Sequence, residues 1–262
     1  MAELRWRNVA AGTIYKRRRC GSCSPSGCTA AVERRQPVDV EVFLDGRSIS
    51  PRTRYDWVSH LHMIFDWGVR HGLADHDPTV RVHRPKVDRL LPRPISDHDL
   101  AEALRQAPPM MRAWLLLGAL AGLRVSEMAR PERPDVLESD MLLRVMGKGR
   151  KERLVPLHPD VLGGLRRAGL PRSGYLFRRP HGSPFPASMV SREISVYLST
   201  VGIDATAHQL RHWFGTKTYR QCRDLRTVQE LLGHASPTTT AIYTAASPLD
   251  ARAAVDALAM PA

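Results

Sequence analysis

The chain has 262 residues, of which 43% are hydrophobic and 25% are charged, as is typical of one large or two smaller globular domains with a sizeable core. Lys and Arg number 39 against 26 Asp and Glu, which gives a formal net charge of +13 at pH 7. This excess predicts a polyanionic partner, nucleic acid before a membrane surface, although a basic surface that only contacts water would have the same composition. The longest apolar run, Trp114 to Leu123, is too short to cross a bilayer, and no secretory apolar region stands at the N-terminus, so a cytoplasmic, nucleoid-associated protein is expected.

Residues 1–36 hold few apolar side chains and carry a basic run from Lys16 to Arg19. Cys20, Cys23 and Cys28 begin like a zinc knuckle, but no fourth Cys or nearby His completes a tetrahedral ligand set, so we expect free thiols and no bound metal. This N-terminal extension is interpreted as a small β segment, a flexible arm on nucleic-acid phosphates or a disordered extension.

From residue 37 to residue 89 the pattern predicts a small helical unit. Val40–Leu44 form a short apolar segment, and Ser50–Pro51 supply an N-cap and a first helical position. Apolar residues at helical spacing predict an amphipathic helix over residues 51–71, which Gly72 is placed to end. Basic side chains on this unit suit contacts with a nucleic-acid backbone, with a solvated face as the alternative. The residues expected to make such contacts are Arg52, Arg54, Arg84 and Lys86.

Residues 90–95 are expected to form a linker, because two prolines in three residues favour an extended, stiff backbone. The second domain, residues 96–262, opens with Ser96 as the cap of a helix that runs to about Gln106. After a Pro-Pro break comes a strongly apolar helix, and Arg124 follows it closely. A guanidinium beside a buried helix is expected either to be paired or to face a ligand.

Residues 141–157 alternate apolar and polar side chains around a Gly-Lys-Gly centre, which predicts a β-hairpin with Lys148 in its turn. This centre is not a phosphate-binding P-loop, because the earlier Gly and the following Ser or Thr are missing. Further helices are predicted over residues 161–169, 188–201, 206–222, 225–232, 238–243 and 248–260. The expected fold class is therefore mainly α with a small antiparallel β-sheet (α+β) in the second domain.

Four side chains in the C-terminal half are of the types that suit phosphate binding and nucleophilic attack. His208 and Arg211 are three positions apart and share one helix face, His234 follows a Leu-Leu-Gly helix end, and Tyr243 lies nine positions further on. Arg holds phosphate oxygens with a planar fork that is always charged. A phenol attacks at neutral pH only when a base or positive charge lies nearby. The set predicts a phosphate site with a tyrosine nucleophile, although each of these side chains alone is more often structural.

Four motifs in this order resemble the tyrosine recombinase (phage integrase) family. The resemblance covers residues 96–250 and extends more loosely over residues 38–95, which look like the second half of the family's core-binding domain. The motifs are Ala121–Glu127, Gly147–Leu157, His208–His212, and Leu231–His234 with Ala241–Thr244.

The resemblance implies that Tyr243 attacks a DNA phosphodiester, forms a 3′-phosphotyrosyl bond and releases a 5′-hydroxyl. Arg124 and Arg211 would grip the non-bridging oxygens of the scissile phosphate, and Lys148 would protonate the leaving 5′-oxygen. Cations held in place stabilise the charge that builds on these oxygens more than they stabilise the ground state.

The remaining site residues take supporting roles under the same resemblance. His208 would act as general base or acid toward Tyr243, and His234 would donate a hydrogen bond to the phosphate. Glu127 would orient Arg124 or support the site. We expect the Arg, Lys and His side chains together to supply the positive field that a metal supplies in other enzymes, so no cofactor, metal or ATP is expected.

The family also implies partners. The expected partner is double-stranded DNA with specific core sites, bound by a homotetramer that is a monomer or weak dimer when free, with an accessory host factor or excisionase as a further candidate and no membrane. Arg150 and Lys151 of the hairpin motif are expected to contact DNA. The last helix, around Leu249 to Met260, would pack on a neighbouring protomer or on its own domain.

The function expected first is integration or excision of a mobile element or prophage. Resolution of chromosome or plasmid dimers uses the same chemistry and is the nearest alternative. A non-catalytic DNA-binding remnant and a type IB topoisomerase are further alternatives. Residues 37–89 would be an abbreviated core-binding domain, because the family normally has more helix ahead of this segment.

Overall fold

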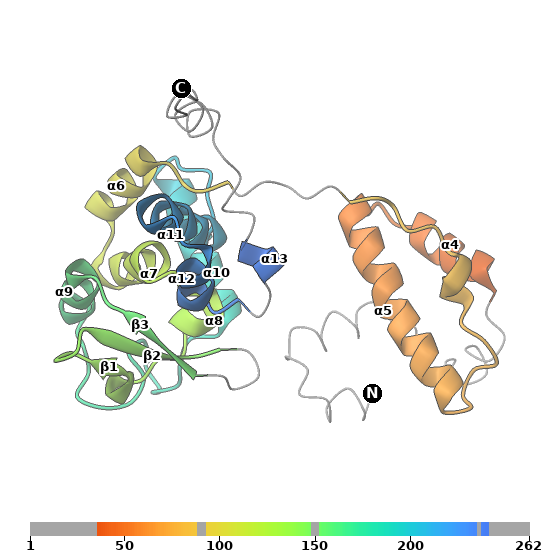
Figure 1. Cartoon of the computed structure of the whole chain (residues 1–262), viewed down its shortest axis with the longest axis horizontal. Helices are drawn as coiled ribbons and strands as arrows, with labels where there is room; N and C mark the ends of the chain where they lie inside the picture. Colours follow the sequence, from red (N-terminus) through yellow and green to blue (C-terminus); the bar gives the residue numbers. More distant parts are fainter. Residues whose placement is uncertain (1–35, 88–92, 148–151, 235–236, 241–262) are drawn as a thin grey trace, which may run out of the picture. The chain divides into compact units, whose positions relative to one another are not determined.

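The computed structural model describes residues 36–87, 93–147, 152–234 and 237–240 (Figure 1). The chain divides into two compact units, Met1–Leu90 and Leu91–Ala262. None of the described helices is long and apolar enough to cross a membrane. Several predictions fall outside the described residues, namely those for Lys148, Arg150, Lys151, Tyr243, the cysteines at 20, 23 and 28, and the helix at 248–260.

The first unit is built from α4 (Pro37–Asp45), α5 (Pro51–Arg70) and the 3₁₀ helix η2 (Pro78–Arg81). The apolar segment at the start of this unit is a helix, and it buries Leu44 against Val58 of α5. The helix predicted over residues 51–71 is confirmed. Ser50 caps it, with its Oγ accepting a hydrogen bond from the backbone N–H of Thr53 at 3.2 Å.

The second unit is mostly helical with one small sheet, so the predicted fold class is confirmed (Figure 1). Strands β1 (Val136–Leu137), β2 (Leu142–Met146) and β3 (Glu152–Pro156) form an antiparallel sheet in the order β1-β2-β3. The pairing of β2 with β3 confirms the predicted hairpin strands. The helical segments are α6 (Asp97–Gln106), α7 (Pro109–Leu120), α8 (Val125–Met128), η3 (Arg133–Asp135), α9 (Pro159–Arg167), α10 (Ala187–Thr200), α11 (Ala207–Cys222), α12 (Leu225–Leu232) and α13 (Pro237–Thr240).

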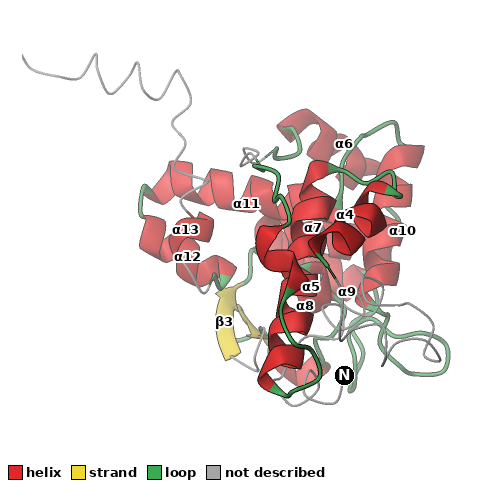
Figure 2. Ribbon diagram, turned by 90° about the vertical axis from the view of Figure 1, so that its right-hand side faces the viewer, coloured by secondary structure: helices red, strands yellow, loops and turns green. Residues whose placement is uncertain are grey.

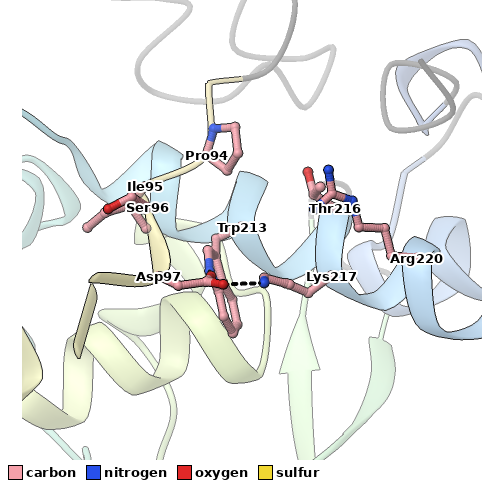
Figure 3. Close-up of a pocket in the computed structure, with 8 residues that line it drawn as sticks. All are labelled: Pro94, Ile95, Ser96, Asp97, Trp213, Thr216, Lys217 and Arg220. Carbon is pink, nitrogen blue, oxygen red and sulfur yellow. Dashed lines mark hydrogen bonds and ion pairs between the residues drawn. The ribbon is translucent and has the colours of Figure 1, made fainter. Parts of the chain in front are cut away.

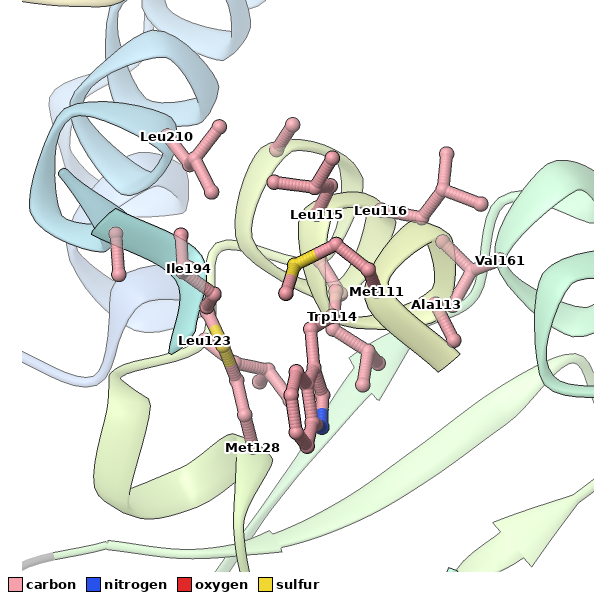
Figure 4. Close-up of a cluster of buried hydrophobic side chains, with 14 of the residues drawn as sticks. Met111, Ala113, Trp114, Leu115, Leu116, Leu123, Met128, Val161, Ile194 and Leu210 are labelled. Atoms are coloured by element: carbon pink, nitrogen blue, oxygen red, sulfur yellow. The ribbon is translucent and has the colours of Figure 1, made fainter. Parts of the chain in front are cut away.

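Helix α7 is the centre of the core of this unit. It is buried along most of its length and packs against α9 and α11, as Figure 4 shows for Leu116, Val161 and Leu210. Close approach depends on small residues, since a Cβ at Gly164 of α9 would lie 2.7 Å from Cδ1 of Leu116, and one at Gly118 would lie 3.0 Å from Cβ of Leu210. This tight packing fixes α11 relative to α7 and so fixes the side chains that α11 carries.

Two short elements that contribute to the site, α8 and β1, were not predicted. Helix α8 has only four residues and strand β1 only two, so neither is long enough to show a period in the sequence. Both elements matter for the candidate site described below. Helix α8 begins directly after Arg124, and β1 belongs to the same sheet as β3, which reaches that site. Figure 2 shows the end of β3 beside α12.

Candidate active site

Arg124 is placed by a sharp turn between α7 and α8. Gly122 has a φ of +61°, and a Cβ there would lie 2.4 Å from Cδ1 of Phe214, so both backbone and packing require glycine. Arg124 is the N-cap of α8, and its backbone N–H donates to Oε2 of Glu127 at 2.8 Å. Its guanidinium donates to Oε1 of Glu127 at 2.9 Å and to the carbonyl oxygen of Gly233 at 3.0 Å. Arg124 is thus paired, while 37% of its side chain stays exposed.

Arg211 reaches the same place from α11. Its Nη1 donates to the carbonyl oxygen of Gly122, and its Nη2 donates to that of Leu232 at 2.6 Å. Nη1 also lies 3.8 Å from Oε2 of Glu127. With only 2% of the residue exposed, Arg211 has little freedom to move. The structure therefore brings together both arginines predicted to bind the scissile phosphate, around one carboxylate.

A third arginine completes the cluster, and the sequence reasoning did not single it out. Arg153 on β3 lies opposite the buried Val145, on the inward face of the sheet. Its Nη1 and Nη2 donate to the two carboxylate oxygens of Glu127 at 2.9 Å each, and its Nε donates to the carbonyl oxygen of Leu231 at 3.2 Å. The available signal was strand alternation, because the apolar Val155 two positions further on shares this face.

The C-terminal end of α12 holds all three guanidinium groups of this arginine cluster, which we define as Arg124, Arg153 and Arg211. The carbonyl oxygens of residues 231, 232 and 233 each accept a hydrogen bond from a different member. A helix leaves these carbonyls unsatisfied, and they lie at the negative end of its dipole, which favours cations. Gly233 ends the helix, as the sequence predicted. Its φ is +60°, and a Cβ there would lie 2.9 Å from Nη1 of Arg153.

Glu127 is the anion at the centre of the arginine cluster. Its side chain is only 3% exposed. Burial by itself raises the pKa of this carboxyl, but the hydrogen bonds and charge of Arg153, followed by those of Arg124, outweigh burial and the pKa is lowered. Glu127 is therefore ionised at neutral pH, and three guanidinium groups against one carboxylate leave the cluster two net positive charges. Such a surplus attracts a phosphate.

His208 and His212 lie next to the arginine cluster on α11, with ring centroids 4.3 Å apart. Burial, followed by the charges of Arg211 and Arg124, lowers the pKa of His208. Burial, followed by the effects of His208 and Arg211, lowers the pKa of His212 to about 4. Both imidazoles are consequently neutral at pH 7.

His234 directly follows the C-cap of α12. Its backbone N–H donates to the carbonyl oxygen of Gln229 at 3.0 Å, and its Nδ1 lies 2.8 Å from Oγ1 of the fully buried Thr240 on α13. Burial, followed by the charges of Arg211 and Arg124, lowers the pKa of His234 to about 4. This corrects the expectation that the two predicted histidines add to the positive field. They are neutral in the protein itself, because burial, followed by the charges of Arg211 and Arg124, disfavours the charged imidazole.

The residues predicted to contact DNA in the first unit differ in their surroundings. Arg54 is ion-paired with Asp45, and Nε of Arg52 lies 3.5 Å from Oδ1 of Asp56. Arg84 and Lys86 are exposed on the segment after η2. These contacts do not test a role in DNA binding, so the assignments stay predictions.

A separate hollow of about 220 Å³ lies where the second unit begins, between the residues before α6 and the C-terminal half of α11 (Figure 3). Asp97 forms part of its wall and accepts hydrogen bonds from Nζ of Lys217 at 2.5 Å and from Nε1 of Trp213 at 2.6 Å. The bond from Lys217, followed by that from Trp213, lowers the pKa of Asp97. The hollow contains none of the predicted catalytic residues, and within the described ranges no group of His, Cys, Asp or Glu could hold a metal ion.

Known proteins are similar to this chain in sequence and in fold. Residues 97–249 match the phage integrase family. The tyrosine recombinase XerC of Mesorhizobium japonicum is 34% identical over 245 residues, which cover 86% of this chain and 78% of the relative. Other curated relatives carry the name tyrosine recombinase XerD.

Solved structures agree with this assignment. The integrase of mycobacterium phage Brujita is 30% identical, with a TM-score of 0.52 over 97% of this chain and 88% of that one. The Tn1549 transposon integrase, solved in complex with circular intermediate DNA, shares the fold with a TM-score of 0.73 over 97% of this chain and 96% of that one, at 18% identity. From its motifs, its arginine cluster and these relatives, the chain belongs to the phage integrase family and is a site-specific tyrosine recombinase of DNA.

Proposed function

We propose that this protein cuts and rejoins DNA strands through a covalent bond between Tyr243 and a DNA 3′-phosphate. The observation that carries the proposal is the arginine cluster, in which Arg124 and Arg211 are held by the same carboxylate and by main-chain carbonyls. Donors fixed before the substrate arrives need no reorganisation as charge builds on the phosphate. Membership of the tyrosine recombinase family supports Tyr243 as the nucleophile.

In the proposed cleavage step the phenol oxygen of Tyr243 attacks phosphorus, and the bond from phosphorus to the 5′-oxygen breaks. The phenol proton passes to His208, whose neutral imidazole has a free pair of electrons to accept it. Lys148 gives a proton to the leaving 5′-oxygen. Arg124 and Arg211 stabilise the non-bridging oxygens, and His234 donates a hydrogen bond to one of them. Rejoining reverses these transfers, and the phosphotyrosyl bond conserves the energy that this requires.

The test traps the protein on a nicked suicide substrate that carries its recombination site. The wild-type chain should form a covalent protein–DNA adduct, and Tyr243→Phe should form none while binding the same DNA. An equal adduct yield from Tyr243→Phe would refute the proposed nucleophile. The absence of any adduct from the wild type would favour the non-catalytic remnant.

The proposed chemistry needs no metal, because the guanidinium groups and Lys148 hold the phosphate and the leaving group. We expect adduct formation to continue in EDTA at an unchanged rate. Strict dependence on Mg²⁺ would overturn this part of the proposal. Matched reactions with and without added Mg²⁺ in the same buffer provide the control.

For the biological outcome we favour resolution of chromosome or plasmid dimers over integration of a mobile element. The curated relatives that cover most of this chain are Xer recombinases. The similarity to a phage integrase keeps integration as the second candidate. A plasmid with two directly repeated sites should be converted to two circles by the chain and its host factors. Efficient joining of two separate circles with little resolution would favour integration.

We also propose that four protomers assemble on two DNA sites, while the free chain is a monomer or weak dimer. Light scattering on the protein with and without two site-bearing duplexes measures both states. A complex of one protomer per duplex that still completes strand exchange would contradict the tetramer.

A further inference from the structure

Arg153 makes its polar contacts with Glu127 and with the end of α12. Its side chain is 14% exposed, against 37% for Arg124. Both terminal nitrogens of Arg153 are used by Glu127, and its Nε is used by Leu231. All three nitrogens of Arg153 thus hydrogen-bond to Glu127 or to the end of α12, which indicates that its effect on the site passes through Glu127.

Without Arg153, the negative charge on Glu127 would act against substrate binding. Its carboxylate contacts Arg124 directly and lies 3.8 Å from Arg211. Without a third cation, this buried anion would cancel half of the positive charge of the two phosphate-binding arginines and draw their guanidinium groups toward itself. A buried charge with too few partners is costly, so this pull would be strong.

We propose that Arg153 is a positioning residue that neutralises Glu127, so that Glu127 can orient Arg124 without withdrawing Arg124 and Arg211 from the scissile phosphate. With Arg153 present the cluster keeps two net positive charges, and without it only one. The inference rests on the proposed function, because it assumes that these arginines hold the phosphate. It also explains why residue 233 is glycine, since Arg153 occupies the space that a Cβ would need.

A similar arrangement elsewhere in the same unit provides a matched control. Glu138 is bound by two arginines, with Nη2 of Arg133 at 2.5 Å and Nη2 of Arg166 at 2.6 Å. The arginines of this control cluster belong to η3 and α9, neither of which carries a member of the arginine cluster, and the Glu138 side chain is 25% exposed. Removal of one arginine from it changes the same kind of interaction without changing the charge beside the phosphate.

The experiment measures single-turnover cleavage of the suicide substrate at saturating protein, with DNA affinity and thermal unfolding measured alongside. We expect Arg153→Gln to slow cleavage about tenfold to a hundredfold, less than the loss of a direct donor would. DNA affinity should change less than about threefold, because only one of many phosphate contacts is affected. Arg153→Lys keeps the charge and should stay within about threefold of the wild type, as should Arg133→Gln.

The decisive variant combines Arg153→Gln with Glu127→Gln, which removes the uncompensated anion. If Arg153 acts by neutralising Glu127, the double variant should cleave at least about fivefold faster than Arg153→Gln alone. A purely structural role predicts no such recovery. A double variant as slow as Arg153→Gln, or Arg153→Gln as fast as the wild type, overturns the proposal.

Two further outcomes are separable. Should Arg153→Gln fail to fold, the double variant and Arg153→Lys decide: adduct formation within about tenfold of the wild type supports the proposal, and its loss in both overturns it. Absence of an adduct from the wild-type chain refutes the proposed function itself. Adduct formation by the wild type with no effect of Arg153→Gln refutes only the role of Arg153.

Discussion

The second unit buries two regions of opposite character side by side. Helix α7 buries an almost entirely apolar surface, whereas the neighbouring arginine cluster buries guanidinium groups around the carboxylate of Glu127. Apolar burial stabilises a fold with few geometric demands, but a buried ion cluster contributes little net stability and needs every partner in place. The comparison indicates that the core supplies the rigidity, and that the cluster uses this rigidity to hold charge where a phosphate binds.

The difference between the two regions is tested most directly at Arg211, where we expect the largest loss of cleavage rate. Arg211→Lys keeps the charge but loses the fork that donates to both Gly122 and Leu232, so the cation is no longer fixed. Cleavage of the suicide substrate should fall about 100-fold to 1000-fold. Arg166→Lys, at an arginine that contacts the remote Glu138, is the control and should cleave normally. Cleavage by Arg211→Lys within threefold of the wild type would contradict the role of the fork.

A truncation in the core should instead lower the free energy of unfolding and leave the cleavage rate nearly unchanged. Leu117 is fully buried in α7, and Leu117→Ala should lower the free energy of unfolding by about 2–5 kcal/mol. Below the unfolding transition, the cleavage rate per folded molecule should stay within about threefold. Urea unfolding and single-turnover cleavage measure the two quantities. Met110→Ala, at an exposed position of the same helix, should change stability by less than about 0.5 kcal/mol. A large loss of rate with normal stability in Leu117→Ala would mean that the two regions are not separable.

A smaller effect is expected where α13 meets the site. The hydroxyl of Thr240 can donate to Nδ1 of His234, which would place the proton of the neutral ring on Nε2, the atom that would donate the proposed hydrogen bond to the phosphate. Thr240→Val preserves the shape but removes this bond, so we expect cleavage to slow about tenfold. Thr240→Ser retains the hydroxyl and should restore most of the rate. Equal rates for the Val and Ser variants would count against this hydrogen bond.

The smallest effect concerns pH. The pKa of His234 is about 4 in the folded protein and near 6.5 when unfolded, so the unfolded chain binds more protons between these values. Its contribution to stability is full above about pH 6.5 and is lost as the pH falls toward 4. Urea unfolding at neutral pH and at about pH 4.5 should show a stability loss that is smaller in His234→Gln. An identical pH dependence in the variant would show that His234 is not buried in its neutral form.

The sequence predicted those features that depend on nearby residues. Helix starts at Ser50 and Ser96, the end of α12 at Gly233 and the hairpin strands all follow from local capping and alternation. The neutral state of His234 could not be predicted, because it depends on burial and on arginines that are distant in the sequence.

Arg153 is an intermediate case. Its inward position could have been found from strand alternation, but its partner could not, since Glu127 lies 26 residues away on another element. The same is true of the carbonyl oxygens at the end of α12, whose arginine donors come from segments distant in the sequence. Local patterns therefore identified most of the charged residues of the site, while tertiary contacts determine which of these side chains are ionised.

The hydrogen bonds from the arginine cluster to residues 231–233 have a consequence for mutational scanning. All three acceptors are main-chain carbonyl oxygens, which every amino acid provides. Substitutions at residues 231 and 232 would therefore change the packing of these side chains without removing a hydrogen-bond acceptor. Only a change in backbone path would remove one, and Gly233 with its left-handed φ of +60° is the position most sensitive to such a change. Substitutions at residues 231 and 232 therefore leave the main-chain contacts that hold the arginines in place, whereas the contacts made by Glu127 depend on its side chain.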